Sequence, residues 1–408
     1  MLFHDRAASR GIRAAGLLVA ALGLVPASSS ARAAFQSVPA IQVPNLVGYW
    51  CVDGLVPDTA TTAQDSSGNG NAGTYTAGAT TMAAAPPVPG GNLKSFLFNQ
   101  AGGQYISVPD SPSLSLTGAF TLAAWIRPTI DSSVQEGIIE KYDDASGIAN
   151  GYSFRLDANE NLSFSVMPAA GGGTGVSTAP RHIPLNAWTH VAGVYDTSGG
   201  TLTNYVNAAA DPSTASGLAP PTDGSNSLQI GKDYGGNAFN GNIDEVRIYN
   251  RALSADEIGI LKDGQPAPTG LTAAGAPGEN LLSWNAPTNA GLVTVQYSVL
   301  RGTSSGAYDT VFNNILTTSF ADTSAAPGTA YFYAVVAVSV MASDPSPEQS
   351  ATASAGSPAP SSSSGTATKS DSGIHSFCGS SSASPAALSP VLLAALLAVV
   401  LLLRGRRA

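Results

Sequence analysis

A glycine-rich segment carries the first side chains that could do chemistry. Asp65, Ser67 and Asn69 place an oxygen at every second residue of Asp65-Ser-Ser-Gly-Asn-Gly-Asn71, and a hard cation such as calcium takes about six to eight oxygen ligands. An EF-hand would have a glutamate at its twelfth position, where this chain has Thr76. The alternative is a tight turn that the Asp65 side chain caps. The sequence therefore predicts either a structural calcium ion or a capped turn.

A second acidic candidate lies in an apolar segment, Gly241-Asn-Ile-Asp-Glu-Val-Arg-Ile-Tyr249. In an extended chain, alternation puts Asp244 on the same face as Val246 and Ile248, which predicts a carboxylate turned toward the interior. A buried carboxylate must be paired, hydrogen-bonded or bound to a cation. Asp244 therefore joins Asp65 and Asn69 as a candidate calcium ligand.

The same side chains give little support for catalysis. A glycosidase needs two carboxylates at a fixed separation on one face, whereas the adjacent Asp244 and Glu245 would point to opposite faces of a strand. His182 and His190 have no serine or cysteine nucleophile in a recognisable setting. We expect no catalytic residue and no enzymatic activity. A polysaccharide hydrolase with an unrecognised site is the less favoured alternative.

Two tyrosines in polar, loop-like surroundings are candidates for ligand binding. Tyr142 lies in Glu-Lys-Tyr-Asp-Asp and Tyr234 in Lys-Asp-Tyr-Gly-Gly-Asn. An exposed aromatic ring with polar neighbours is the surface on which a sugar ring packs. The alternative for each is a loop tyrosine packed at the rim of the domain.

Composition favours an all-β protein and excludes one class of partner. Charged residues make up only 11% of the chain, and its 44 glycines indicate short strands joined by many turns. The net charge of -9 and the absence of a basic cluster in the globular part argue against nucleic acid. Cys51 and Cys378 lie in different regions, so they predict no disulfide framework.

A series of short alternating runs without intervening helices predicts a β-sandwich or jelly roll at about residues 45–264. Its sequence blocks resemble the concanavalin A-like, laminin-G type 3 family, in that family's order. The resemblance implies a jelly roll, a fold often used to bind sugars, and frequently a structural calcium. Cys51 departs from the family pattern and is expected to be a small buried residue. The blocks are Gly48-Tyr-Trp50, Asp65 to Asn71, Tyr105 to Leu114, Phe120 to Pro128, Asn186 to Tyr195 and Gly241 to Ser254.

A second sandwich is expected at residues 266–354. Trp284, Tyr297, Leu300 and Pro327-Gly-Thr-Ala-Tyr-Phe-Tyr-Ala-Val335 resemble the fibronectin type III family, which implies an immunoglobulin-like fold. The resemblance also implies that the hydroxyl group of Tyr331 bonds back to the chain. The expected role of this domain is that of a spacer or a weak binding surface.

Both ends of the chain carry the features of targeting segments. Residues 1–33 have arginines before an apolar run and end in Ala31-Arg-Ala33, which predicts a signal peptide cleaved after Ala33. Residues 386–403 form an uncharged apolar run that is long enough for a transmembrane helix. The arginine-rich residues 404–408 would then be a cytoplasmic tail, by the positive-inside rule.

Residues 355–385 are rich in serine, glycine, alanine and proline, which predicts a flexible stalk. Cys378-Gly379, the spacer after it, the apolar run and the final arginines resemble the C-terminal sorting tails of bacteria, most closely the myxobacterial type. That resemblance implies a sorting protease that cuts near Cys378. The alternative is a plain single-pass anchor with an incidental thiol.

These features together predict an exported, membrane-anchored, non-catalytic protein of the cell surface. The laminin-G-like domain would recognise an extracellular glycan or another surface protein, with the second sandwich and the stalk holding it away from the membrane. A structural envelope scaffold without a discrete ligand is the alternative.

Overall fold

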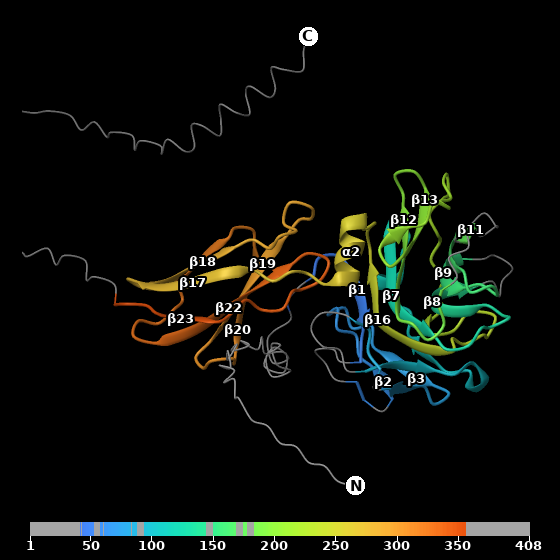
Figure 1. Ribbon diagram of the computed structural model, residues 1–408, viewed down its shortest axis with the longest axis horizontal. Coiled ribbons are helices and arrows are strands. Elements are labelled where there is room, and N and C mark those ends of the chain that lie inside the picture. Colours follow the sequence, from blue (N-terminus) through green and yellow to red (C-terminus); the bar gives the residue numbers. More distant parts are fainter. Residues whose placement is uncertain are drawn as a thin grey trace, which may run out of the picture. The chain divides into compact units, whose positions relative to one another are not determined.

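The computed structural model describes residues 41–355, except residues 42, 53–57, 60, 83, 88–93, 144–149, 169–173 and 178–182. Ala33, Cys378, His182, the predicted stalk and both predicted membrane-directed segments lie outside the described residues. Among the residues described, no helix has the length and apolar character needed to cross a bilayer. Figure 1 shows the arrangement of the strands, which dominate the structure.

The first domain is a sandwich of two antiparallel sheets. Sheet A has the strand order β14-β13-β12-β7-β16-β5-β4, and β1 also pairs with β16. Its strands are β1 (Leu46–Trp50), β4 (Thr80–Met82), β5 (Ser95–Phe98), β7 (Phe120–Pro128), β12 (Thr189–Asp196), β13 (Thr201–Val206), β14 (Ala209–Ala210) and β16 (Gly241–Tyr249).

Sheet B has the order β11-β10-β9-β8-β15-β6-β3-β2. Short 3-10 helices at Gln100–Gly102 (η1) and Pro112–Leu114 (η2) flank β6. The strands of sheet B are β2 (Thr62–Ala63), β3 (Gly73–Thr76), β6 (Tyr105–Val108), β8 (Glu136–Asp143), β9 (Asn150–Leu156), β10 (Leu162–Met167), β11 (Thr174–Ser177) and β15 (Leu228–Ile230).

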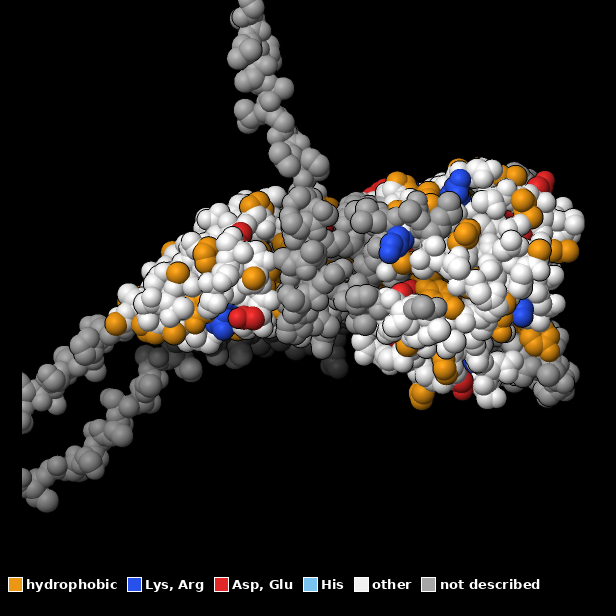
Figure 2. Space-filling model, turned by 90° about the horizontal axis from the view of Figure 1, so that it is seen from below, with side chains coloured by type: hydrophobic (Ala, Val, Ile, Leu, Met, Phe, Trp, Pro, Cys, Tyr) orange, Lys and Arg blue, Asp and Glu red, His pale blue; other side chains and the backbone are white. Residues whose placement is uncertain are grey.

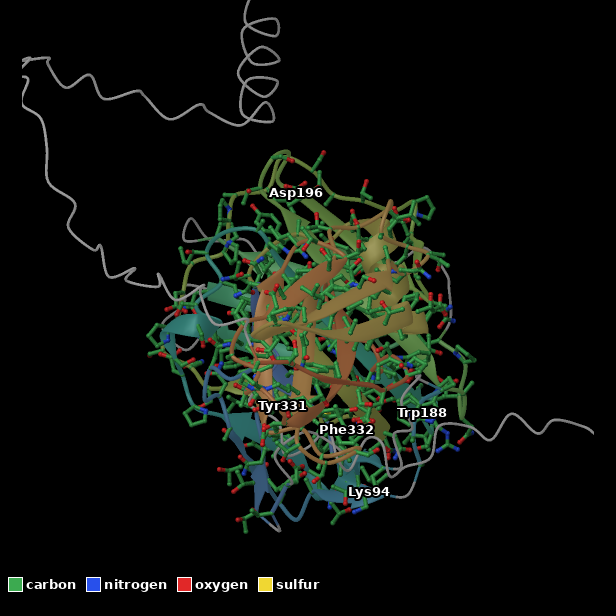
Figure 3. All side chains as sticks on the ribbon, turned by 90° about the vertical axis from the view of Figure 1, so that its left-hand side faces the viewer. Lys94, Trp188, Asp196, Tyr331 and Phe332 are labelled. Atoms are coloured by element: carbon green, nitrogen blue, oxygen red, sulfur yellow. The ribbon has the colours of Figure 1, made fainter. Side chains whose placement is uncertain are left out.

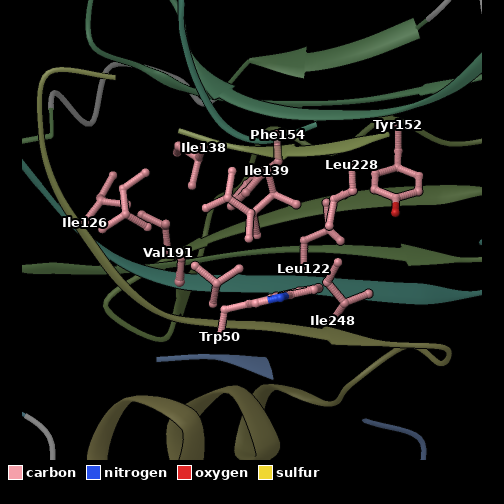
Figure 4. Packing of buried hydrophobic residues seen from close by; sticks show 14 of the residues in the cluster. Trp50, Leu122, Ile126, Ile138, Ile139, Tyr152, Phe154, Val191, Leu228 and Ile248 are labelled. Atoms are coloured by element: carbon pink, nitrogen blue, oxygen red, sulfur yellow. The ribbon is translucent and has the colours of Figure 1, made fainter. Parts of the chain in front are cut away.

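The core of the first domain lies between these sheets (Figure 4). Phe120 of sheet A and Phe164 of sheet B meet edge to face, with ring centroids 5.6 Å apart. Trp50 is fully buried, and its indole N–H donates to the Asn71 carbonyl oxygen at 2.8 Å. The alternation seen in the sequence therefore separates a shared apolar interior from two outward faces.

One helix, α2 (Ala255–Asp263), packs on the outward face of sheet A, where the sequence predicted only strands. Its capping box is formed by Ser254, whose hydroxyl accepts from the Glu257 N–H, and by Glu257, whose carboxylate accepts from the Ser254 N–H. Ile258 and Leu261 of the helix share an apolar cluster with Ala123 and other small residues of the sheet.

The second sandwich has one sheet of order β17-β18-β21 and another of order β20-β19-β22-β23. Trp284 and Tyr297 pack edge to face in its core, with centroids 5.3 Å apart. Its strands are β17 (Thr269–Ala276), β18 (Glu279–Asn285), β19 (Gln296–Gly302), β20 (Thr310–Ile315), β21 (Ser319–Asp322), β22 (Ala330–Val338) and β23 (Gln349–Thr352). The prediction of a mostly β protein is thus confirmed.

The tyrosine contacts of the second sandwich differ in strength. The Ala326 N–H points to the hydroxyl oxygen of Tyr331 at 3.5 Å, a weak version of the expected contact (Figure 3 labels Tyr331). Tyr333 is fully buried and donates to Asp322 at 2.8 Å while accepting from Asn280 at 2.8 Å. Tyr333 is therefore the tyrosine that ties the two sheets together.

Candidate functional site

The Asp65 segment forms a turn capped by its first carboxylate. One oxygen of Asp65 accepts from the Tyr49 and Ser67 backbone N–H groups at 3.0 and 2.8 Å. The other oxygen accepts from the Ser67 hydroxyl at 2.8 Å and from the Asn71 N–H at 2.9 Å. Four donors thus surround this carboxylate, as in the capped-turn interpretation.

The other candidate calcium ligand in this segment, Asn69, takes part in the same turn. The Asn69 side chain donates to the Leu46 carbonyl at 3.0 Å, and Gly68 and Gly70 have φ values of +87° and +78° that the turn requires. Within the described part of the chain, no three His, Cys, Asp or Glu side chains group closely enough to hold a metal ion. These residues therefore fit a turn better than a calcium cage, and calcium stays a prediction.

Asp244 is buried, but the predicted direction of its side chain was wrong. It lies opposite Trp125 of β7, and the register shifts between Asp244 and Arg247. The cause is a bulge at Glu245, whose φ of 54° breaks the alternation. Val246 therefore returns to the core, while Asp244 occupies the outward face of sheet A with Trp125.

Buried polar side chains of β1 and β16 contact each other beside this bulge. Arg247 forms an ion pair with Glu245, and the Tyr49 hydroxyl donates to the same carboxylate at 3.0 Å. The Arg247 guanidinium lies 4.2 Å from the centroid of the Tyr49 ring. Cys51 is 1% exposed, and burial, followed by the Glu245 charge, raises the pKa of its thiol well above the ordinary value. Cys51 is thus a buried, unreactive thiol at neutral pH.

His190 has the properties of a structural histidine. It packs edge to face on Trp125, with ring centroids 5.4 Å apart. Burial, followed by the charges of Arg247 and Lys262, lowers its pKa to about 3. The imidazole is therefore neutral at ordinary pH.

The structure brings the two candidate ligand-binding tyrosines together. Tyr142 lies near the end of β8, and Tyr234 lies in the connection between β15 and β16. Their rings meet edge to face with centroids 5.1 Å apart and planes at 80°. Tyr142 is half-buried and Tyr234 is 39% exposed. We call these two residues the tyrosine pair.

Tyr234 lies in a short loop, residues 232–238. Hydrogen bonds between residues of this loop stabilise its conformation. The Asp233 carboxylate accepts from the Asn237 backbone N–H at 2.6 Å and from its side-chain amide at 2.9 Å. Lys232 and Ala238 form an antiparallel bridge at the base of the loop. A ring on a loop fastened in this way loses little conformational entropy when it binds a ligand.

A buried carboxyl group of β8 forms a hydrogen bond with this loop. Glu140 is 2% exposed and accepts from the Tyr234 N–H at 3.1 Å. Burial raises the pKa of Glu140 to about 7, and the Tyr234 N–H and the Arg155 charge offset part of the rise. A Cβ atom at Gly137 would lie 2.0 Å from the Lys232 carbonyl carbon, so the loop rests directly on β8.

Glu136 and Glu140, four residues apart on one strand, do not form a glycosidase pair. The register between β8 and β9 shifts between Gly137 and Ile139. Glu136 is consequently paired with Leu156 of the core, whereas Glu140 is paired with Ser153 of the outward face. The two carboxyl groups therefore point to opposite faces of sheet B. The absence of enzymatic activity stays a prediction.

Sequence reasoning singled out both tyrosines, whose role in binding stays a prediction, and missed the residues that place them. Asp233 and Asn237 gave only the signal of polar residues close to a glycine pair, and Glu140 gave only that of an acidic residue two positions before Tyr142. The bulge at the start of β8 conceals which face of the strand Glu140 occupies.

On the face of the molecule seen in Figure 2, apolar side chains are scattered among polar ones, so a large apolar docking patch is not evident there.

Comparison with known families supports the predicted fold of the first domain. Residues 100–259 match the family model for the laminin-G type 3 domain, described as the concanavalin A-like lectin/glucanases superfamily. This stretch is therefore a concanavalin A-like domain, which confirms that part of the resemblance.

Similar solved structures include the binding domain of Paraclostridial Mosquitocidal Protein 1, at 16% identity and a TM-score of 0.43, covering 71% of this chain and 70% of that one. The CBM40 of a Ruminococcus gnavus sialidase, solved with α2,3-sialyllactose, matches at 14% identity and a TM-score of 0.33, covering 37% and 85%. An Fn3-like protein from Clostridium thermocellum matches at 38% identity and a TM-score of 0.20, covering 22% and 93%.

Proposed function

We propose that the first domain is a glycan-binding module and that the tyrosine pair is the centre of its binding surface. The observation that carries this proposal is the meeting of Tyr142 and Tyr234, which come from segments far apart in the sequence, with centroids 5.1 Å apart. Tyr234 keeps 39% of its surface exposed on a loop that is fastened at both ends.

The chemistry of this surface suits a sugar. The C–H face of a sugar ring packs on an aromatic ring, while its hydroxyl groups need polar neighbours. Asn226 donates to the Tyr142 carbonyl at 3.0 Å, so a polar side chain borders the tyrosine pair. The lectins named in the matching family's description provide further support for a glycan partner.

For the whole chain, we propose an exported cell-surface binding or adhesion protein. The support comes from the predicted signal peptide at residues 1–33, the apolar run at 386–403 and the sorting motif at Cys378. The second sandwich, whose fibronectin-like character is part of this proposal, would act with the stalk as a spacer. A scaffold without a ligand is the alternative.

A glycan array with residues 34–354 tests the module, with Tyr234→Ala and Tyr234→Phe compared on each positive glycan. Tyr234→Phe keeps the ring and is expected to bind like the unaltered protein. Tyr234→Ala is expected to bind about fivefold more weakly, because a packed aromatic ring contributes on the order of 1 kcal/mol. Silence of the unaltered protein on the whole array would favour the scaffold.

A further inference from the structure

Four polar side chains lie together on the outward face of sheet B, beside the loop that carries Tyr234. The strand register places Glu140 opposite Ser153 of β9 and opposite Gln229 of β15. Arg155 follows Ser153 by two residues and so shares its face. We call Glu140, Ser153, Arg155 and Gln229 the polar cluster.

Two members of the polar cluster, Arg155 and Gln229, have a buried polar atom with no hydrogen-bond partner among the described residues, namely Arg155 Nε and Gln229 Oε1. The Ser153 side chain is a hydrogen-bond partner of the Glu140 carboxyl group. Buried polar atoms in folded proteins nearly always have a partner. Two of the side chains, Arg155 and Gln229, are partly exposed, so rotation of these side chains would open the cluster to a ligand.

We propose that the polar cluster is the hydroxyl-binding part of the glycan site and that it selects neutral sugars with adjacent hydroxyl groups over sugars that carry a carboxylate. This inference rests on the proposed glycan-binding function. One sugar hydroxyl would donate to Gln229 Oε1, while the Arg155 Nε–H donates to a sugar oxygen and the Glu140 carboxyl group lies beside both. The ring face of the same sugar would pack on Tyr234.

The charges around the cluster disfavour an anionic sugar. A sugar carboxylate would approach Glu140 and also Asp233, whose charge contributes to raising the pKa of Glu140. The Arg155 charge already lies near Glu140. Lys141 is on the other face of β8, where Asp110 and Asp223 bind it at 3.1 and 2.7 Å.

The protonation state of Glu140 also favours a sugar hydroxyl over a carboxylate as its partner. Because burial raises its pKa to about 7, the group is partly protonated near neutral pH and can donate as well as accept. A sugar hydroxyl can take either role, whereas a carboxylate can only accept.

The test uses the full chain on a sensor surface and measures its affinity for neutral oligosaccharides of glucose, galactose and mannose. Each is paired with the same oligosaccharide after oxidation of its primary hydroxyl groups to carboxylates. We expect at least one neutral form to bind about tenfold more tightly than its oxidised form. Gln229→Ala should weaken that binding by about tenfold, and Glu140→Gln, which keeps an acceptor for the Tyr234 N–H, should narrow the preference for the neutral form.

Glu136→Gln, on the opposite face of β8, is the matched control and should change neither affinity nor preference. Equal or tighter binding of every oxidised form would overturn the selectivity. If Tyr234→Ala abolishes binding while Gln229→Ala and Glu140→Gln leave it unchanged, the tyrosine pair stands and the polar cluster has no part in recognition. Failure of all the oligosaccharides to bind, or indifference to Tyr234→Ala, would count against the glycan-binding function as well.

Discussion

At the residue scale, the single buried carboxyl group of Glu136 makes the stability of the fold depend on pH. It is fully buried at the start of β8, near Glu160. Burial, followed by the charge of Glu160, raises the pKa of Glu136 from an ordinary 4.5 to about 8. The folded protein therefore binds a proton more tightly than the unfolded chain does. The stability that comes from this proton is present below about pH 4.5 and is lost as the pH rises toward 8.

Glu136→Gln is expected to remove this pH dependence. The neutral amide cannot ionise, so the variant should gain on the order of a few kcal/mol over the unaltered protein at pH 9 and little at pH 4. Urea unfolding at several pH values measures the difference. Parallel pH profiles for the two proteins would contradict the assignment of the raised pKa.

Two residue-scale features show which aspects of the candidate site the sequence could and could not predict. Tyr142 and Tyr234 could be chosen one at a time, because each is an aromatic residue in a polar segment. Their contact could not be predicted, since it depends on the pairing of β8 with β15. The direction of Asp244 was wrong because a bulge at Glu245 has no signature in a simple alternation.

At the element scale, alternation and turn residues were enough to predict most strands that build the core. They could not reveal the bulge in β8, which sends Glu136 inward and Glu140 outward. Helix α2 was missed although Ser254 and Glu257 have the spacing of a capping box. A short helix between long strand patterns carries too few apolar residues for its periodicity to stand out.

Contact between β8 and the 232–238 loop leads to a prediction for Gly137. A methyl group there would lie 2.0 Å from the Lys232 carbonyl carbon, so Gly137→Ala must displace the loop. We expect a loss of about 1–3 kcal/mol in thermal unfolding experiments, together with weaker glycan binding. Gly118→Ala, where no heavy atom lies within 4 Å of the new methyl group, is the matched control. Equal unfolding temperatures for the two variants would refute the close approach.

The second sandwich depends on a buried ion pair between its sheets. Asp322 receives hydrogen bonds from Arg301 at 2.8 Å and from the Tyr333 hydroxyl at 2.8 Å. Burial alone would raise the pKa of Asp322, but hydrogen bonds from Ser324, Arg301 and Tyr333 outweigh it and lower the pKa below 3.8. The stabilisation is present above that ordinary value and is lost as the pH falls through the lowered pKa.

Asp322→Asn should therefore destabilise the second sandwich by about 1.5–3 kcal/mol at pH 7, because the partly buried Arg301 loses its charged hydrogen-bond partner. The deficit should shrink in strongly acidic solution, where the carboxylate of the unaltered protein is protonated. Calorimetry of the two proteins at pH 7 and pH 2 measures both effects. A deficit of the same size at both pH values would show that Asp322 acts through packing and not through charge.

At the scale of the whole molecule, the proposed surface location depends on segments outside the described residues. If a sorting protease cuts near Cys378, then Cys378→Ala should leave the protein in its uncut, membrane-bound form. Intact-mass measurement of the protein recovered from membranes and from the cell surface tests this expectation. Recovery of the unaltered protein with its C-terminal tail still uncut would favour the plain single-pass anchor.

The central claim is that Tyr142 and Tyr234 act as one binding surface, and a double-mutant cycle tests it most directly. Affinity for a glycan that the unaltered protein binds is measured for Tyr142→Ala, Tyr234→Ala and the double variant. Because the rings contact each other at 5.1 Å, the account predicts that both single changes weaken binding and that their effects couple by at least about 0.5 kcal/mol. Additive effects, or a Tyr234→Ala variant that binds as tightly as the unaltered protein, would contradict it.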